Sequence, residues 1–149
     1  MVRLNLMLAL AAVLFAAGAR AEQPPAVNYM LHCMGCHLAD GSGGPPDVPD
    51  VRGEMGRLLA VEGGRQYLVQ VPGAAQAPVS DAELAGIVNY MLESFNGETL
   101  PEDYRPLTED EVAGWRKDWL PDVSAVRRVL IGRVEKHLST GRDPSRKQP

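Results

Sequence analysis

Residues 32–44, with the sequence HCMGCHLADGSGG, contain both cysteines of the chain. Cys33 and Cys36 are separated by two residues, and His37 follows directly. Two thiols and an imidazole within five positions form a compact set of groups that bind metals or react covalently. This spacing is therefore the starting point for predicting what the chain does.

Three alternatives account for only part of this set. A disulfide between Cys33 and Cys36 would close a very small loop and stabilise the fold weakly. A dithiol redox motif belongs between a strand and a helix, and no strand-like apolar run precedes this one. A zinc site needs two further ligands nearby, and the other histidines are only His32 and His137.

The remaining interpretation uses all three side chains. In C-x-x-C-H, each thiol forms a thioether bond with one vinyl group of a haem, and the histidine binds the iron. Two intervening residues place both sulfur atoms along one edge of the porphyrin, and the next side chain then points under the ring. The pattern occurs once, so the sequence predicts one covalent haem c held by Cys33 and Cys36, with His37 as a metal ligand.

The N-terminal residues have the features of an export signal. Arg3 is followed by an apolar run over residues 6–17 and then by Ala19-Arg20-Ala21. This pattern predicts a signal peptide over residues 1–21 and a periplasmic protein, the alternative being an uncleaved anchor. Removing Arg3 and Arg20 leaves 13 basic and 19 acidic side chains, so the mature chain is a poor candidate for non-specific nucleic-acid binding.

Helical signals surround the motif. Ser80 and Glu83 form a capping-box pattern, and apolar residues then recur at helical spacing at Leu84, Ile87, Val88, Met91 and Phe95. Gly97 follows as a stop signal. Residues 38–56 are rich in Gly, Pro and Asp without periodicity, which predicts a loop.

Over about residues 25–95 the chain resembles the small class I c-type cytochromes. The similar stretches are AVNYMLHC with Tyr29 on the first helix, GSGGPPDVPDVRG after the motif, GGRQYLVQV, and VSDAELAGIVNYMLESF with Tyr90 on the closing helix. The resemblance implies an all-α fold: a small cytochrome c-like helical domain over residues 22–97, wrapped round one covalent haem, with its first and last helices crossing.

The resemblance also implies partners for the haem site. A proline carbonyl after Gly is expected to accept a hydrogen bond from His37; Pro45 and Pro46 are available, and Pro45 is favoured because it directly follows Gly44. Arg57 matches a position that often pairs with a haem propionate. The alternative for Arg57 is an ordinary solvated surface charge.

The sixth iron ligand departs from the family pattern. The resemblance places a methionine in the loop before the last helix, but here that loop, QVPGAAQAPVSD, contains neither Met nor His. Met55, in the Gly-flanked segment RGEMGR, is the favoured substitute. An open or water-bound iron is the next alternative, followed by Met91, His32, Gln76 and His137.

This ligand decides the predicted function. Two strong axial ligands favour an electron carrier and not an enzyme. Such a carrier would operate between periplasmic redox proteins, for example a dehydrogenase donor and a cytochrome or oxidase acceptor. An open sixth position would instead give a gas-binding or weakly peroxidatic haem protein. The distal loop offers no His or Glu ahead of Asp81, and this absence argues against peroxidase catalysis.

The chain continues for some fifty residues beyond the expected end of the haem domain. Thr108 and Glu111 form a second capping-box pattern, before a short helix with Val112, Trp115 and Trp119 on one side. A further helix with an apolar stripe at Val123, Val126, Val129, Leu130, Val134 and Leu138 is predicted after Pro121. These helices make a C-terminal helical extension over residues 98–138, before a basic, disordered tail over 139–149. The extension either packs on the haem domain or docks an acidic redox partner or an anionic lipid surface.

Overall fold

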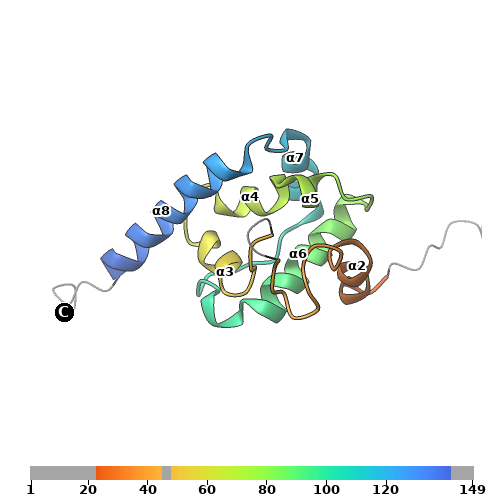
Figure 1. Cartoon of the computed structure of the whole chain (residues 1–149), viewed down its shortest axis with the longest axis horizontal. Helices are drawn as coiled ribbons and strands as arrows, with labels where there is room; N and C mark the ends of the chain where they lie inside the picture. The colour runs from red at the N-terminus through yellow and green to blue at the C-terminus, as the bar shows by residue number, and fades with distance from the viewer. Residues whose placement is uncertain (1–22, 45–47, 142–149) are drawn as a thin grey trace, which may run out of the picture.

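The computed structural model describes residues 23–44 and 48–141, and the protein is all-α (Figure 1). The predicted signal peptide lies outside these residues. Within them no residue is in a strand, and no helix is long and apolar enough to cross a membrane. The helices are α2 (Pro25–His32), α3 (Glu54–Leu59), α4 (Gly64–Gln70), α5 (Pro72–Ala75), α6 (Asp81–Phe95), α7 (Glu109–Trp115) and α8 (Val123–Gly141), with 3-10 turns η1 (Gly97–Thr99) and η2 (Arg116–Asp118).

The first and last helices of the predicted haem domain, α2 and α6, pack against each other. Tyr29 of α2 meets Tyr90 and Phe95 of α6, with ring centroids 5.6 and 5.5 Å apart. The Tyr90 and Phe95 rings lie edge to face at 5.7 Å, an arrangement that favours aromatic contacts. Tyr29 is only 1% exposed, so this aromatic cluster fixes α2 on α6 immediately before the cysteine motif.

Helix α6 begins where the sequence predicts. The Ser80 hydroxyl accepts a hydrogen bond from the Glu83 amide at 3.1 Å, and the Glu83 carboxylate accepts one from the Ser80 amide at 2.8 Å. These two bonds complete the predicted capping box. The predicted apolar stripe is buried at Leu84, Ile87, Val88 and Met91, which confirms the helical spacing.

The predicted loop over residues 38–56 is wrong at its end. Gly53 adopts a left-handed conformation with φ 68°, and α3 begins at the next residue, Glu54. The Gly53 amide also donates to the Phe95 carbonyl at 3.2 Å, which joins the start of α3 to the end of α6. Because glycine adopts positive φ without steric penalty, Gly53 allows the chain to turn directly into a helix, and Met55 lies in that helix.

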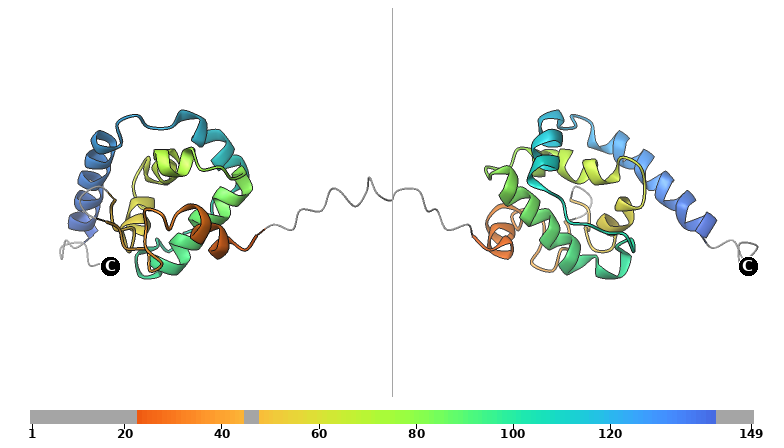
Figure 2. Two further views of the ribbon diagram at one scale, coloured as in Figure 1. Left: turned by 45° about the vertical axis from the view of Figure 1, so that its right-hand side comes forward. Right: turned by 180° about the vertical axis from the view of Figure 1, so that it is seen from behind.

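The extension packs on the rest of the chain. After η1 the chain runs back along α6 to reach α7 (Figure 2), and α7 contacts α6 and α4. The Asn89 amide group of α6 holds the backbone of Leu107 on both sides, donating to its carbonyl at 2.9 Å and accepting from its amide at 2.7 Å. Leu107 and Val112 are 4% and 0% exposed. These contacts favour the packing alternative for this part of the extension.

Helix α8 packs on α3 and projects from the body at its end (Figure 1). Leu130 and Val134 are buried, but Val129 of the predicted apolar stripe is 55% exposed. One residue corresponds to about 100° of helix rotation, so the Leu130–Val134 face turns Val129 toward solvent. α8 continues to Gly141, three residues beyond the predicted boundary at 138, and the Ser139 and Thr140 hydroxyls donate to carbonyls of its last turns.

Candidate functional site

The turn after α2 brings together the three side chains of the cysteine motif. α2 ends at His32, and the Cys33 amide still donates to the Tyr29 carbonyl at 2.9 Å. The amides of Cys36 and His37 then both donate to the Cys33 carbonyl, at 3.1 and 2.9 Å. A single tight turn therefore presents both thiols and the imidazole.

Both thiols of this turn are free. Cys33 is half-buried and Cys36 is exposed. Burial, assisted by the neighbouring Cys36, raises the pKa of the Cys33 thiol to about 11. A reactive redox cysteine needs a lowered pKa, because the thiolate is the nucleophile. The environment of Cys33 thus argues against the dithiol redox alternative.

The imidazole of His37 is placed as a neutral ligand. Burial lowers the pKa of His37, and the carboxylate of Asp50 opposes this effect only partly. The ring is therefore mainly neutral at pH 7, which is the form that binds a metal. Its Nδ1 atom is buried and has no hydrogen-bond partner among the described residues. The predicted acceptor, Pro45, lies outside those residues.

These features fit a covalent haem better than a protein-only metal site. Two free thiols lie at the end of α2, a neutral imidazole follows, and the buried Nδ1 of His37 requires an acceptor. In contrast, the described residues contain no cluster of three or more His, Cys, Asp or Glu side chains that would hold a metal ion. The zinc alternative therefore has no support in this part of the chain.

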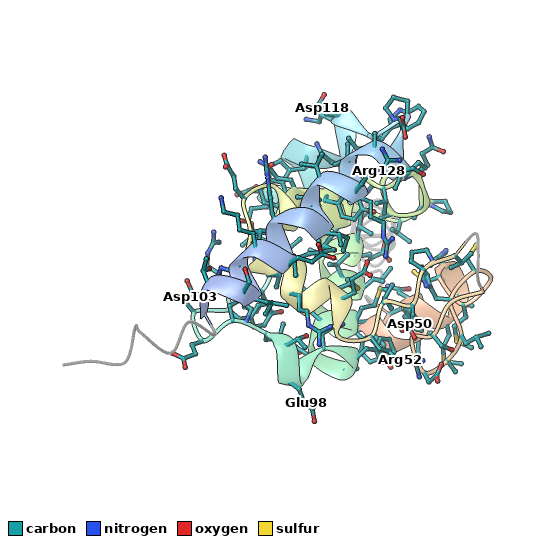
Figure 3. The ribbon with its side chains drawn as sticks, turned by 60° about the vertical axis from the view of Figure 1, so that its left-hand side comes forward. Asp50, Arg52, Glu98, Asp103, Asp118 and Arg128 are labelled. Carbon is teal, nitrogen blue, oxygen red and sulfur yellow. The ribbon has the colours of Figure 1, made fainter. Side chains whose placement is uncertain are left out.

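The segment that follows His37 is fixed by a short hydrogen-bond network. The Tyr29 hydroxyl donates to the Leu38 carbonyl at 2.6 Å. The Arg52 guanidinium pairs with Asp50 at 2.6 Å (Figure 3). It also pairs with Asp40 at 3.0 Å, so it bridges the two carboxylates. Its hydrogen bond to Asp50 holds the pKa of that carboxyl at about 2. Sequence reasoning missed this bridge, although the D-x-R spacing of Asp50 and Arg52 was a local signal.

The remaining predicted ligands and partners occupy three different environments. Met55 is 6% exposed on α3 and Met91 is 7% exposed on α6, and both belong to the hydrophobic core. Arg57 is exposed and lines a cavity of about 380 Å³ between α3 and α8, together with His137. His32 and Gln76 are exposed.

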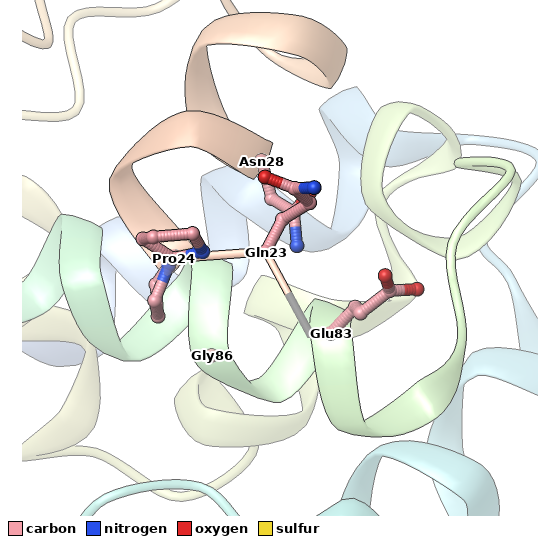
Figure 4. A pocket seen from close by; sticks show the side chains of 6 residues that line it. Gln23, Pro24, Asn28, Glu83 and Gly86 are labelled. Carbon is pink, nitrogen blue, oxygen red and sulfur yellow. The ribbon is translucent and has the colours of Figure 1, made fainter. Parts of the chain in front are cut away.

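A second cavity, of about 290 Å³, lies at the N-terminal end of α2 (Figure 4). Gln23 and Pro24, directly before α2, and Asn28 of α2 line one side, and Glu83 and Gly86 of α6 line the other. α2 begins here and ends at the cysteine turn. The cavity is therefore separate from the thiols and from His37.

Residues 71–80, where the family resemblance expects the distal ligand, form α5 and an irregular segment that leads to α6. Arg116 of η2 holds this segment. Its guanidinium donates to the carbonyls of Ala75 at 3.1 Å, Ala77 at 2.8 Å and Val79 at 2.9 Å. It also pairs with Asp81 at 2.8 Å. The sequence contains no local signal for these contacts, because 35 to 41 positions separate the partners.

Comparison with known proteins agrees with the geometry of the motif. No protein-family model matches the chain. One cytochrome c-552 of Thermus thermophilus is 27% identical over 142 residues, covering 83% of this chain and 96% of the relative. A second cytochrome c-552 of the same species is 29% identical over 129 residues, covering 74% of this chain and 98% of the relative. Over most of its length the chain is therefore similar to c-type cytochromes, which supports the resemblance to the class I family.

The name of both relatives agrees with the interpretation of the cysteine motif as a haem attachment site. Coverage of 83% of the chain is more than the 97 residues that precede the extension. The similarity to the first relative therefore continues into the extension.

Proposed function

We propose that this cytochrome is a periplasmic electron carrier that takes one electron from a dehydrogenase and passes it to a downstream cytochrome or oxidase. The observation that carries the proposal is the turn after α2, which presents two free thiols and a neutral imidazole. When bound, haem c supplies a one-electron ferric–ferrous couple. The apolar run and Ala-Arg-Ala sequence at the N-terminus support export.

The residues of the turn have distinct roles in this proposal. Cys33 and Cys36 hold the haem through thioether bonds, and His37 binds the iron. Pro45 accepts a hydrogen bond from Nδ1 of His37, which orients the ring and strengthens it as a ligand. Tyr29 fixes the chain beyond the ligand through its bond to Leu38.

The surface around the turn supports docking of a redox partner by apolar contact. Met30, Leu31 and Leu38 are 60%, 66% and 57% exposed, and Cys36 is exposed among them. Residues 23–39 contain no Asp, Glu, Lys or Arg. A charge-free apolar surface beside the haem attachment site suits a transient complex that depends weakly on salt. In a test, Leu31→Asp slows reduction by the dehydrogenase, whereas Leu138→Asp, at the far end of α8, does not.

Two proposals remain for the sixth iron position. Met55 is the proposed ligand of the electron carrier, and its buried position on α3 would shield the Fe–S bond from water. A specific observation favours the alternative, a gas-binding haem protein. The segment over residues 71–80 contains no Met or His, and its Gln76 side chain is exposed.

Mass spectrometry and absorption spectra test the cofactor and its axial ligands. The exported chain, made in cells able to attach haem c, is expected to begin at Glu22 and to carry the mass of one haem. His37→Ala is expected to change the spectrum, whereas His32→Ala, the matched control at the end of α2, is not. A colourless chain with the mass of its amino acids alone would refute the proposal.

Carbon monoxide distinguishes the two proposals for the sixth position. A ferrous spectrum that is unchanged by the gas supports the carrier with a bound Met55, and Met55→Leu then makes the iron reactive while Met91→Leu does not. A sharply shifted Soret band in the unmodified protein supports the gas-binding alternative.

A further inference from the structure

The chain that follows His37 makes a tight turn and later returns to it. The Gly41 amide donates to the Leu38 carbonyl at 3.0 Å, and Gly41 adopts a left-handed conformation with φ 82°, which glycine permits without steric penalty. Ten residues further along, the Val51 amide donates to the Gly41 carbonyl at 3.1 Å. Val51 and its neighbours are therefore attached to the turn directly after His37.

A cluster of charged side chains lies where the chain returns. The Arg52 guanidinium donates to both carboxylate oxygens of Asp50, at 2.6 to 3.1 Å, and to Asp40 at 3.0 Å (Figure 3). The Arg52 amide also donates to the Asp50 carboxylate at 2.9 Å, and Asp40 accepts two hydrogen bonds from Ser42, at 2.6 and 3.0 Å. Backbone and side-chain bonds therefore fix both carboxylates, and the three charged side chains together are negative.

Asp50 is the member of this cluster that acts on the imidazole of His37. Burial lowers the pKa of His37, and the Asp50 carboxylate raises it. The hydrogen bonds from Arg52 hold the pKa of Asp50 at about 2, and His37 adds to this effect, so Asp50 is ionised at pH 7. The side chains of Arg52 and Asp50 are 48% and 46% exposed. Water therefore weakens their field at His37 without abolishing it.

We propose that the Asp50–Arg52 ion pair sets the electrostatic potential at the imidazole of His37 and thereby tunes the reduction potential of the iron that this imidazole binds. This inference rests on the proposed function, in which His37 is the iron ligand. In that one-electron couple the ferric state carries one more positive charge than the ferrous state. The Asp50 carboxylate therefore favours the ferric state and lowers the potential, and the Arg52 guanidinium offsets part of this effect.

The test measures the midpoint potential of the haem-bearing, full-length protein by spectroelectrochemistry at pH 7. The variants are Asp50→Asn, Arg52→Gln and the control Asp118→Asn. Asparagine keeps an oxygen that accepts from the Arg52 amide, so Asp50→Asn removes the charge and retains this loop contact. Asp118 is exposed on η2, away from Asp50 (Figure 3). Its replacement changes the net charge of the protein by the same amount.

The two changes in the ion pair are expected to shift the potential in opposite directions. At a fixed applied potential, Asp50→Asn is expected to raise the ratio of ferrous to ferric protein about threefold. This ratio corresponds to a potential about 30 mV higher, because a tenfold change is about 59 mV for one electron. Arg52→Gln is expected to lower the ratio about twofold or more. Both shifts are expected to shrink at high ionic strength, which screens exposed charges.

Three outcomes would overturn the inference. One is a ratio in Asp50→Asn that stays within about 1.3-fold of the unmodified protein. Another is a ratio in Arg52→Gln that is unchanged or raised, because loosening of the loop would shift both variants in the same direction. The third is an equal shift in Asp118→Asn, which would show an effect of net charge alone. Failure of the proposed function is separate, since it appears as the absence of haem from the unmodified chain.

Discussion

Neutralising Glu111 is expected to destabilise the protein in a way that depends on pH. The Arg65 guanidinium of α4 forms two bonds with this carboxylate, at 3.0 and 2.7 Å, and also donates to the carbonyls of Arg105 and Pro106. The side chains of Arg65 and Glu111 are each 19% exposed. This pair joins α4 to the start of α7, so it connects the extension to the haem-bearing part of the chain.

The magnitude follows from the pKa of Glu111. Chiefly through its hydrogen bonds to Arg65, the folded protein lowers this pKa from 4.5 to about 2. Such a difference corresponds to at most about 3.4 kcal/mol, and partial solvent screening reduces the expected contribution to about 1–2 kcal/mol. A lowered carboxyl pKa stabilises the fold above the unfolded-state value of 4.5, and the stabilisation disappears as pH falls toward 2.

Denaturant titration of the haem-bearing protein measures this contribution. Glu111→Gln keeps an acceptor for the capping box but removes the charge, and it is expected to lower the free energy of unfolding by about 1–2 kcal/mol at pH 7. At pH 3 less than half of that loss is expected to remain. Glu109→Gln, an exposed change in the same helical turn, is the control. Equal losses at pH 7 and pH 3, or an equal loss in the control, would refute the reasoning.

Three further substitutions test individual contacts by the same titration at pH 7. Asn96→Ala removes a 2% exposed amide that bonds the backbones of α3 and α6, and is expected to cost about 2–3 kcal/mol. Gly41→Ala places a methyl group 2.8 Å from the Phe95 ring at φ 82°, and is expected to cost about 2 kcal/mol or more. Gly44→Ala serves as its control, because the added methyl group meets no atom of the described residues within 4 Å. Tyr29→Phe removes the bond to Leu38 and is expected to cost about 1 kcal/mol; a loss below about 0.3 kcal/mol would show that this bond does not stabilise the fold.

The parts of the fold that the sequence predicted well depend on neighbouring residues. Each capping box lies within four positions, and both Ser80 with Glu83 and Thr108 with Glu111 form as expected. The cysteine motif is similarly contiguous, so one turn determines the relation of Cys33 to His37. Such features are visible in the sequence because backbone geometry alone brings the groups together.

The parts that could not be predicted depend on contacts between distant residues or on one backbone angle. Arg65 and Glu111 are 46 positions apart, and Arg127 and Glu54 are 73 apart. No periodic pattern in the sequence indicates that either pair of side chains meets. The start of α3 depends on the positive φ of Gly53, which a Gly-rich stretch permits but does not specify. The glycines on both sides of Met55 therefore indicate a flexible loop in the sequence, whereas in the structure this residue lies in a helix and is buried.

The extension and the predicted haem domain are joined by one hydrophobic core. Leu107, Val112, Leu130 and Val134 from the extension belong to the same buried cluster as Tyr29 of α2. Because buried groups from both parts lose their contacts together, the two parts are expected to unfold cooperatively and not in sequence. Arg116, which follows α7 in the extension, adds polar contacts to the same connection through its hydrogen bonds to Ala77 and Asp81. Replacing either the buried apolar residues or Arg116 is therefore expected to destabilise both parts of the chain together.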